Sequence, residues 1–167
     1  MNQLEEFKAI HTFIFDVDGV LTNNEVLITE DGQLLRKMNV KDGLAIKLAI
    51  QAGYNFCVIT GGKSEGVRKR LEALGINDIY LDKQNKLEAY LEYVDEKDIE
   101  PDGILYMGDD LPDYPVMRKV GLPTCPQNSA PEIIGLAKYI SPFKGGEGCA
   151  RDVIEKVMRI QEKWELE

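Results

Sequence analysis

Two aspartates stand two residues apart at the end of an apolar run, Thr12-Phe-Ile-Phe-Asp16-Val-Asp18. The run predicts a buried strand that carries both carboxylates to its carboxyl end. In an open α/β sheet ligands bind at that end, because the loops that leave the strands form a crevice there. One carboxylate at such a place can attack an electrophile, and a second can move a proton. We therefore expect Asp16 to be a nucleophile and Asp18 its acid/base partner.

Further polar groups follow other predicted strands. Thr60 and Gly61 follow a strand over 54–59, and Lys86 lies just inside the helix after a strand over 78–81. The strand over 104–107 leads into an acidic cluster of Asp109, Asp110 and Asp113. Because parallel strands end at one side of a sheet, we expect all these groups to converge. Carboxylates, a hydroxyl and an ammonium suit phosphoryl transfer, and Mg²⁺, which prefers oxygen ligands, fits the acidic part.

The remaining pattern predicts the elements that position these groups. Strand-like runs on both sides of Asp31-Gly32 predict a β-hairpin at about 25–40, because this turn needs positive φ. Leu44, Leu48 and Ala52 predict the apolar face of a helix that Gly53 ends, and Ser64 predicts the N-cap of the next helix. Further helices and strands are predicted over 84–94, 114–120, 122–125, 130–137 and 139–140, with Leu87, Leu91 and Val94 as the apolar face of the first.

The alternation of strands and helices predicts an α/β fold: one three-layer α/β/α domain over residues 1–167. Its sheet is parallel and doubly wound, the hairpin is an extension, and a C-terminal tail at about 145–167 ends in an amphipathic helix.

Composition limits the class of protein. The chain has 167 residues, enough for one core, and its 20 basic and 29 acidic residues give a net charge of −9. That charge argues against nucleic-acid or anionic-membrane partners. Three cysteines without CxxC spacing indicate reduced thiols. The first residues lack the pattern of a secretory leader and no apolar run reaches membrane-spanning length, so we expect a soluble cytoplasmic protein.

The motifs resemble those of a known family. Asp16-x-Asp18-Gly-Val-Leu-Thr, Ile59-Thr60-Gly, Lys86 and Gly108-Asp109-Asp110 are similar, in this order, to the four motifs of the haloacid dehalogenase superfamily. Asn39-Val-Lys-Asp-Gly-Leu-Ala-Ile and Gly145-Gly-x-Gly-x-x-Arg151 resemble a narrower capless group. This group contains the 3-deoxy-D-manno-octulosonate 8-phosphate phosphatases and their nonulosonate 9-phosphate relatives.

The resemblance implies roles for the acidic residues. Asp16 would attack phosphorus to give an aspartyl-phosphate, and Asp18 would protonate the departing sugar oxygen and later deprotonate water. Mg²⁺ would be held by the Asp16 carboxylate, the Asp18 backbone carbonyl and Asp109. Asp110 and Asp113 would orient a metal-bound water and the lysine.

The resemblance also implies how the phosphate and sugar are bound. Thr60, Gly61 and Lys86 would bind the phosphate. The substrate would be a phosphorylated 2-keto-3-deoxy sugar acid, octulosonate 8-phosphate first, with a nonulosonate 9-phosphate or a broader range of sugar phosphates as alternatives. Candidates for binding the sugar carboxylate are Arg68, Arg70 and Arg151.

The spacing leaves no room for the cap domain that most of the superfamily carries. Residues 23–59 and 61–85 are used by the predicted hairpin, helices and strands. In the resembled group neighbouring subunits of a homotetramer close the site, and 25–40 and 145–151 are the matching stretches. This chain departs from the group at Asn23-Asn24, at Gly62, where arginine or glutamate is common, and at Leu81-Asp82. These changes concern sugar specificity.

Other interpretations remain at the level of the residues. Thr60 can form a turn, Lys86, Arg68 and Arg70 can be solvated, and Asp113 can cap a helix. At the level of function, a phosphoacceptor receiver domain also collects acids, a threonine and a lysine around Mg²⁺, but it places its acidic pair and its phosphoacceptor on different strands. A noncatalytic scaffold and a metal-independent dehalogenase are further alternatives.

Overall fold

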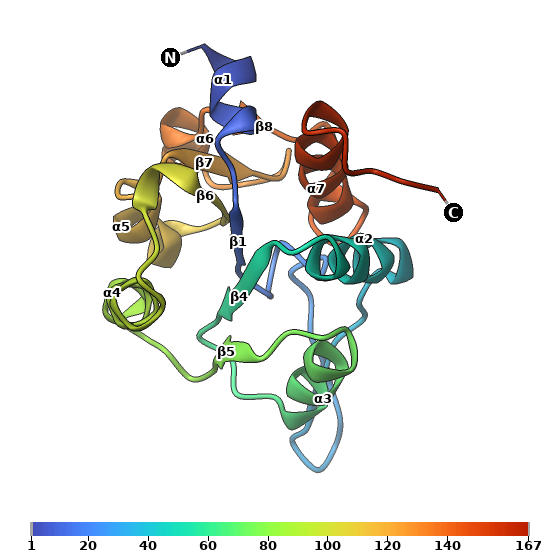
Figure 1. Ribbon diagram of the computed structural model, residues 1–167. Coiled ribbons are helices and arrows are strands. Elements are labelled where there is room, and N and C mark those ends of the chain that lie inside the picture. The colour runs from blue at the N-terminus through green and yellow to red at the C-terminus, as the bar shows by residue number, and fades with distance from the viewer. Residues whose placement is uncertain (1, 167) are drawn as a thin grey trace.

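Six parallel strands form the central sheet of the structure, a computed structural model that describes residues 2–166 (Figure 1). Met1 and Glu167, the ends of the predicted domain 1–167, lie outside the described residues. In the middle, β1 (Thr12–Phe15) pairs with β4 (Asn55–Ile59) on one side and β6 (Ile104–Met107) on the other. The order is β5-β4-β1-β6-β7-β8, with β5 at Asp78–Tyr80, β7 at Leu122–Cys125 and β8 at Tyr139–Ile140.

Helices cover both faces of the sheet, which explains why β1 and β6 are apolar and buried along their whole length. One face packs against α1 (Gln3–Lys8), α2 (Val40–Gln51), α3 (Glu65–Ala73) and α7 (Cys149–Ile160). The other packs against α4 (Lys86–Lys97), α5 (Tyr114–Met117) and α6 (Pro131–Leu136). Short 3₁₀-helices occupy Pro101–Gly103 and Leu111–Asp113. The predicted three-layer, doubly wound arrangement is confirmed.

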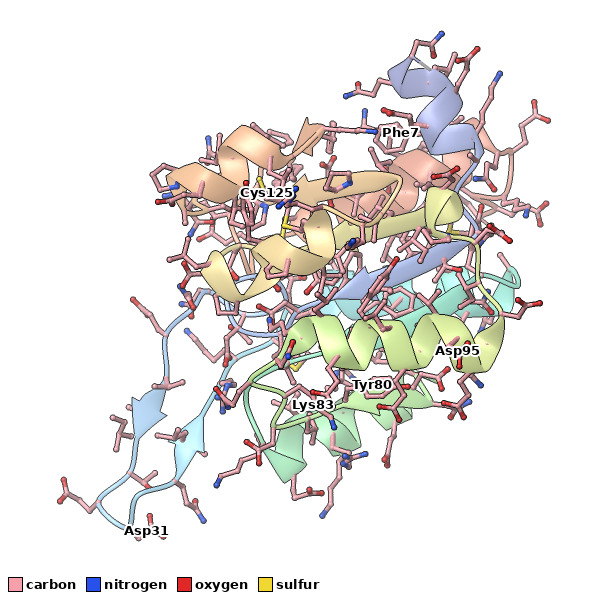
Figure 2. The ribbon with its side chains drawn as sticks, turned by 90° about the vertical axis from the view of Figure 1, so that its left-hand side faces the viewer. Phe7, Asp31, Tyr80, Lys83, Asp95 and Cys125 are labelled. Atoms are coloured by element: carbon pink, nitrogen blue, oxygen red, sulfur yellow. The ribbon has the colours of Figure 1, made fainter. Side chains whose placement is uncertain are left out.

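The predicted hairpin is present, and it projects from the body of the molecule with Asp31 at its tip (Figure 2). Its strands, β2 (Leu27–Ile28) and β3 (Leu34–Leu35), are short, and Gly32 has the positive φ of +86° that the turn requires. All four strand residues are exposed. They form two cross-strand pairs, Leu27 with Leu35 and Ile28 with Leu34, which point to opposite faces, so both faces of the ribbon present apolar side chains to solvent.

The predicted apolar faces of two helices are correct in part: Leu48 and Ala52, and Leu87 and Val94, are partly buried against the core, whereas Leu44 and Leu91 are exposed. In α2 the buried residues include Ala45, Ile46 and Ala49, whereas Leu44 is 49% exposed. The alanines allow α2 to lie close to the sheet and to α7, which turns Leu44 outward. In α4 Ala89, Tyr90 and Tyr93 are buried and Leu91 is 53% exposed. The large rings of Tyr90 and Tyr93 therefore occupy the buried side of α4, where the leucine spacing predicts Leu91.

The N-terminal helix α1 was not predicted. Its N-cap Asn2 accepts a hydrogen bond from the backbone of Glu5, whose side chain accepts one from the backbone of Asn2. This capping box is visible in the sequence as Asn2 and Glu5 three residues apart. Phe7 is the buried residue that docks the helix.

The connections between the sequence motifs are short. Between Asp18 and Thr60 lie the hairpin, α2 and β4, and between Thr60 and Lys86 lie α3 and β5. Within residues 2–166 neither connection contains a cap domain. Over the same residues, no helix combines the length and the apolar character needed to cross a membrane.

Candidate functional site

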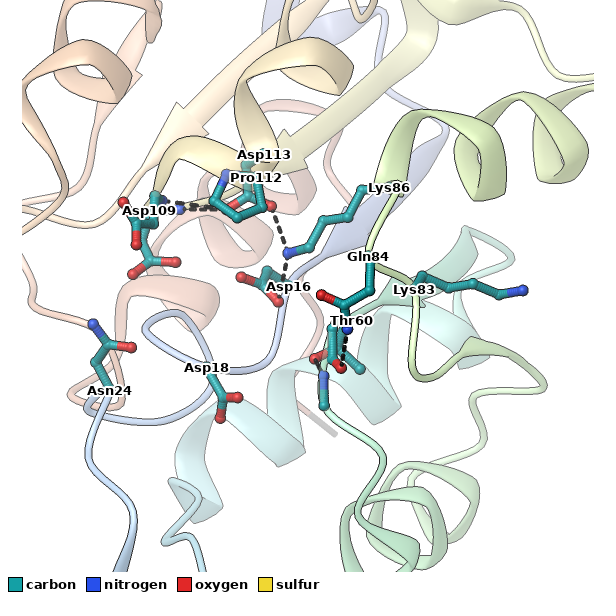
Figure 3. A pocket seen from close by; sticks show the side chains of 13 residues that line it. Asp16, Asp18, Asn24, Thr60, Lys83, Gln84, Lys86, Asp109, Pro112 and Asp113 are labelled. Atoms are coloured by element: carbon teal, nitrogen blue, oxygen red, sulfur yellow. Dashed lines mark hydrogen bonds and ion pairs between the residues drawn. The ribbon is translucent and has the colours of Figure 1, made fainter. Parts of the chain in front are cut away.

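A cavity of about 240 Å³ opens where β1, β4 and β6 end (Figure 3). The chain fills one half of the sheet from β1 outward and then returns to start the other half at β6, so the cavity lies at the switch point of the topology. The predicted residues that line it are Asp16, Asp18, Thr60, Gly61, Lys86, Asp109, Asp110 and Asp113. Convergence of these groups at one edge of the sheet agrees with the expectation from the sequence.

Lys86 joins two carboxylates at the bottom of the cavity. Its Nζ lies 2.9 Å from Asp16 Oδ1 and 2.9 Å from Asp113 Oδ1 (Figure 3). The side chain comes from the first turn of α4, which Asn85 caps, and is only 5% exposed. Lys86 is therefore not the solvated helix residue of the alternative interpretation.

The charged neighbours of Asp16 and Lys86 shift the pKa values of these two groups. Burial raises the pKa of Asp16 well above its ordinary value, the Asp113 charge adds to the increase, and Lys86 opposes it. Burial lowers the pKa of Lys86, but the Asp16 and Asp113 carboxylates outweigh burial and leave that pKa raised. The ammonium thus stays charged between the two acids.

Asp113 fixes the loop after β6. Its Oδ1 also accepts a hydrogen bond of 2.6 Å from the Tyr106 hydroxyl, and its Oδ2 accepts from the backbone N–H groups of Asp109 and Asp110. The side chain makes no capping bond to α5, so the alternative of a simple helix cap is wrong. The sequence analysis did not identify Tyr106 as a site residue. A hydroxyl on an otherwise apolar strand that leads into the acidic cluster could have indicated it.

Asp109 lies close to Asp16, and its carboxylate packs against the turn at Gly19 that follows the Asp-x-Asp pair. Burial raises the pKa of Asp109 to about 7, and the Asp113 charge contributes to the increase. Gly19 has a φ of +87°, and a Cβ there would overlap the Asp109 carboxylate. The Asp-x-Asp-Gly motif therefore needs its glycine for both backbone conformation and space.

The donor set fits a divalent cation. Asp16, Asp109 and Asp113 are buried, and each offers an oxygen within 4.8 Å of the others. Asp113 already bonds Lys86, Tyr106 and two backbone N–H groups, so Asp16 and Asp109 have the oxygens available for a metal. Buried like charges repel one another, and a cation between them relieves the repulsion.

Asp18 lies at the side of the cavity, and its carboxylate points away from Asp16 (Figure 3). It pairs through both oxygens with Arg36, at 2.6 Å from Nε to Oδ1 and 3.2 Å from Nη2 to Oδ2. Arg36 follows β3 of the hairpin. Sequence reasoning missed it, because no spacing signal connects a hairpin arginine with a strand-end acid.

Thr60 directly follows β4 and is buried. Its Oγ1 accepts a hydrogen bond from the backbone N–H of Gly62, which leaves the hydroxyl proton free to be donated into the cavity. Asp110 accepts from the backbone N–H of Leu111 and begins the 3₁₀-helix there. It lines the rim without contacting Lys86.

The three candidate arginines lie outside this cavity. Arg68 pairs with Glu65 and Glu72 on its own helix. The Arg70 guanidinium lies where a Cβ on Gly43 of α2 would stand. Arg151 pairs with Glu155 and lies over the Trp164 ring, 5.5 Å from its centre. Within one chain the structure does not bring them to the acids.

The glycine-rich turn (residues 145–148) packs under the acid loop (residues 16–23) of its own chain. Gly146 N–H donates to Val20 O, and the Cys149 thiol contacts the same carbonyl at 3.2 Å. A Cβ on Gly145 would overlap the Gly19 carbonyl. This close backbone approach gives the glycines of the turn a structural role within the chain.

Comparison with known proteins gives a consistent set of relatives. A family model described as haloacid dehalogenase-like hydrolase matches residues 74–152. The chain is 36% identical over 154 residues to the 3-deoxy-D-manno-octulosonate 8-phosphate phosphatase of Escherichia coli K12, covering 92% of this chain and 82% of that one.

Solved structures are similar over most of their length. The phosphatase of the same name from Moraxella catarrhalis, in complex with a magnesium ion, a phosphate ion and a KDO molecule, has a TM-score of 0.93 at 30% identity, covering 96% of this chain and 92% of that one. The cobalt-bound deoxy-D-mannose-octulosonate 8-phosphate phosphatase of Haemophilus influenzae has a TM-score of 0.90 at 26% identity, covering 94% and 92%.

Proposed function

This chain belongs to the haloacid dehalogenase-like hydrolases, in the family of the 3-deoxy-D-manno-octulosonate 8-phosphate phosphatases, and we propose that it hydrolyses the phosphomonoester of such a sugar acid. The products are free 3-deoxy-D-manno-octulosonate and phosphate. One observation carries the proposal: the buried Asp16 carboxylate, paired with Lys86, faces Asp109 in a cavity that also holds Asp18 and Thr60. The cavity thereby brings together a nucleophile, an ammonium donor, a hydroxyl donor and a group that can carry a proton.

The reaction proceeds in two displacements at phosphorus. An Asp16 oxygen attacks phosphorus, the bond to the sugar oxygen breaks, and Asp18 gives its proton to that oxygen. A water molecule then gives a proton to Asp18 and attacks phosphorus, and the bond to Asp16 breaks. Lys86, the Thr60 hydroxyl and the backbone N–H of Gly61 bind the phosphate oxygens, and Asp110 and Asp113 hold the loop and the lysine in place.

The acids of this site fit a Mg²⁺ ion. The Asp16 and Asp109 carboxylates and the Asp18 backbone carbonyl would hold it. When bound, Mg²⁺ supplies positive charge that offsets the repulsion between the phosphate dianion and Asp16. The magnesium and cobalt ions in the similar structures support this assignment.

The sugar end of the site is open in one chain, so we propose that a homotetramer completes it. The exposed apolar hairpin and the absence of a cap within residues 2–166 support assembly. Contacts to the sugar carboxylate would come from Arg68, Arg70 and Arg151 across subunits. The three buried free cysteines are compatible with a reducing cytoplasm. We propose that the octulosonate released there is used in lipopolysaccharide synthesis.

The first test is phosphate release by the purified chain with and without Mg²⁺. We expect Asp16→Asn to lower kcat by at least about a thousandfold, because a carboxamide cannot form the acyl-phosphate. Chelation should abolish activity and added Mg²⁺ should restore it. Asp95→Asn, on the exposed side of α4, is the matched control and should keep full activity. Metal-independent release, or full activity of Asp16→Asn, would contradict the proposed function.

The second test compares kcat/KM for octulosonate 8-phosphate, nonulosonate 9-phosphates and simple hexose phosphates. The octulosonate should give the highest value. A higher kcat/KM for a nonulosonate 9-phosphate would indicate that this sugar acid is the substrate instead. Equal kcat/KM values for all the substrates would show that the enzyme does not recognise the sugar acid.

A further inference from the structure

Arg36 is the buried cation that the proposed reaction does not yet use. It stands just after β3, and its side chain turns back from the hairpin onto the acid loop with only 9% of it exposed. Two of its nitrogens meet the two oxygens of Asp18, at 2.6 and 3.2 Å. A planar guanidinium that meets a carboxylate in this way fixes the direction of the carboxylate as well as its position.

Gly62 makes this contact possible. A Cβ on Gly62 would lie 3.2 Å from Arg36 Nη2 and 3.6 Å from both Asp18 Oδ2 and Thr60 Oγ1. A longer side chain would compete with Arg36 for this space. The chain departs from the resembled group at this residue, and here the charge next to Asp18 comes from Arg36 after the hairpin strand.

Arg36 also stands beside the space that a leaving group needs. A second cavity, of about 760 Å³, lies between the hairpin and the loops after β4 and β5, and Arg36 lines it. This cavity and the one with the acids share Gly61, Gly62 and Gln84. The two cavities therefore adjoin, and Asp18, which lines the smaller one, pairs with Arg36, which lines the larger one.

We propose that Arg36 is a positioning residue, which holds the Asp18 carboxylate in place for proton transfer at the ester oxygen and thereby makes the hairpin part of the acid/base machinery. This inference rests on the proposed function. The guanidinium keeps its own protons throughout. Because both Asp18 oxygens accept from the guanidinium, the carboxyl group keeps one orientation through the proton transfers of both displacements.

The test compares two leaving groups. The sugar of octulosonate 8-phosphate leaves through an alkoxide oxygen that needs a proton, whereas p-nitrophenyl phosphate releases p-nitrophenolate, a stable anion. For Arg36→Met, which keeps the apolar stem, we expect kcat on the sugar phosphate to fall about 10- to 100-fold, because misplacing Asp18 removes part of the roughly 100- to 10,000-fold that general acid–base catalysis contributes. The single-turnover burst of p-nitrophenolate should fall less than about threefold, since it needs no acid. KM for the sugar phosphate should change little.

A double-mutant cycle separates positioning from a general structural effect. If Arg36 acts through Asp18, Arg36→Met should add no further loss to Asp18→Asn. Arg36→Lys keeps the charge but not the paired geometry and should fall between Arg36→Met and the wild type. Arg118→Met removes an exposed arginine at the C-cap of α5 and should leave activity on both substrates unchanged. Thermal unfolding of each variant shows whether it is folded.

Equal losses on the two substrates, additive losses in the cycle, or a change in KM alone would overturn the positioning role. A wild-type chain that hydrolyses no phosphomonoester would instead overturn the proposed function, and this inference with it.

Discussion

At the scale of residues, the site depends on one cation held between two buried acids. Lys86 touches Asp16 and Asp113, and all three side chains are buried. A buried pair is worth little compared with apolar packing, but removal of one partner leaves an uncompensated charge. The same ammonium that is assigned to the phosphate therefore also stabilises the fold around the site.

Replacement of this lysine should show both roles. For Lys86→Met we expect loss of phosphatase activity and a decrease of about 3 kcal/mol in the free energy of unfolding at neutral pH, because two carboxylates lose their counter-charge. Urea unfolding without Mg²⁺ measures the decrease. Lys83→Met, next to the same cavity but without an ion pair in the described residues, should change stability by less than about 0.5 kcal/mol. A Lys86→Met protein as stable as the wild type would contradict the structural role.

Some of these residues could be predicted from the sequence and others could not. Asp16, Thr60 and Asp109 follow directly after apolar runs, and the parallel sheet alone brings strand ends together. Arg36 reaches the site because the chain after β3 of the hairpin turns its side chain back toward Asp18. Tyr106 reaches the site because its side chain points from β6 toward Asp113. Neither leaves a periodic pattern in the sequence.

At the scale of elements, strand positions were easier to predict than helix faces. A buried parallel strand is marked by a short, continuous apolar run, as in β1 and β6, whatever its partners are. The buried face of a helix depends on what it packs against. In α2 that partner is α7, and Asp42 connects the two helices, with Oδ1 accepting from the backbone N–H of Arg151 at 3.0 Å.

Asp42 should make this connection dependent on pH. The residue is only 2% exposed, and its Oδ2 has no hydrogen-bond partner among the described residues. Burial raises the pKa of Asp42 from 3.8 to about 6, against the lowering effect of the Arg151 contact. The folded chain therefore binds this proton more tightly than the unfolded chain, and stability falls as the pH rises from about 4 to about 6.

Asp42→Asn removes this titration. Its unfolding free energy relative to the wild type should rise by on the order of 3 kcal/mol between pH 4 and pH 7, since one pKa unit corresponds to about 1.4 kcal/mol. Urea unfolding across this pH range measures the difference, with Asp95→Asn as the exposed control. Parallel pH curves for Asp42→Asn and wild type would show that Asp42 titrates normally.

At the scale of the whole molecule, the hairpin is the apolar part of a strongly acidic protein. The net charge of −9 favours dispersed monomers, whereas four exposed apolar residues on β2 and β3 favour association. In the proposed tetramer the hairpin would contribute to subunit contacts on its outside and hold Asp18 through Arg36 on its inside. Assembly and acid/base chemistry would then depend on one element.

Charge placed on the hairpin should break up the assembly. Leu27 and Leu35 are paired across the two strands, and the double variant Leu27→Lys, Leu35→Lys should lower the mass measured by sedimentation from four chains toward one. Activity on the sugar phosphate should fall with it. Leu91→Lys, on the exposed side of α4, is the matched control and should keep the mass. A wild-type monomer, or a double variant of unchanged mass, would contradict the role of the hairpin.

The glycine-rich turn also determines when the site can be complete. The contact between Cys149 and Val20 joins residues 129 positions apart. A ribosome delivers the acid loop long before the turn that supports it. The two acids thus leave the ribosome in a segment whose Val20 carbonyl meets its partners, the Gly146 N–H and the Cys149 thiol, only after the turn has emerged. A nascent fragment that lacks the turn therefore carries both acids on a loop without this support.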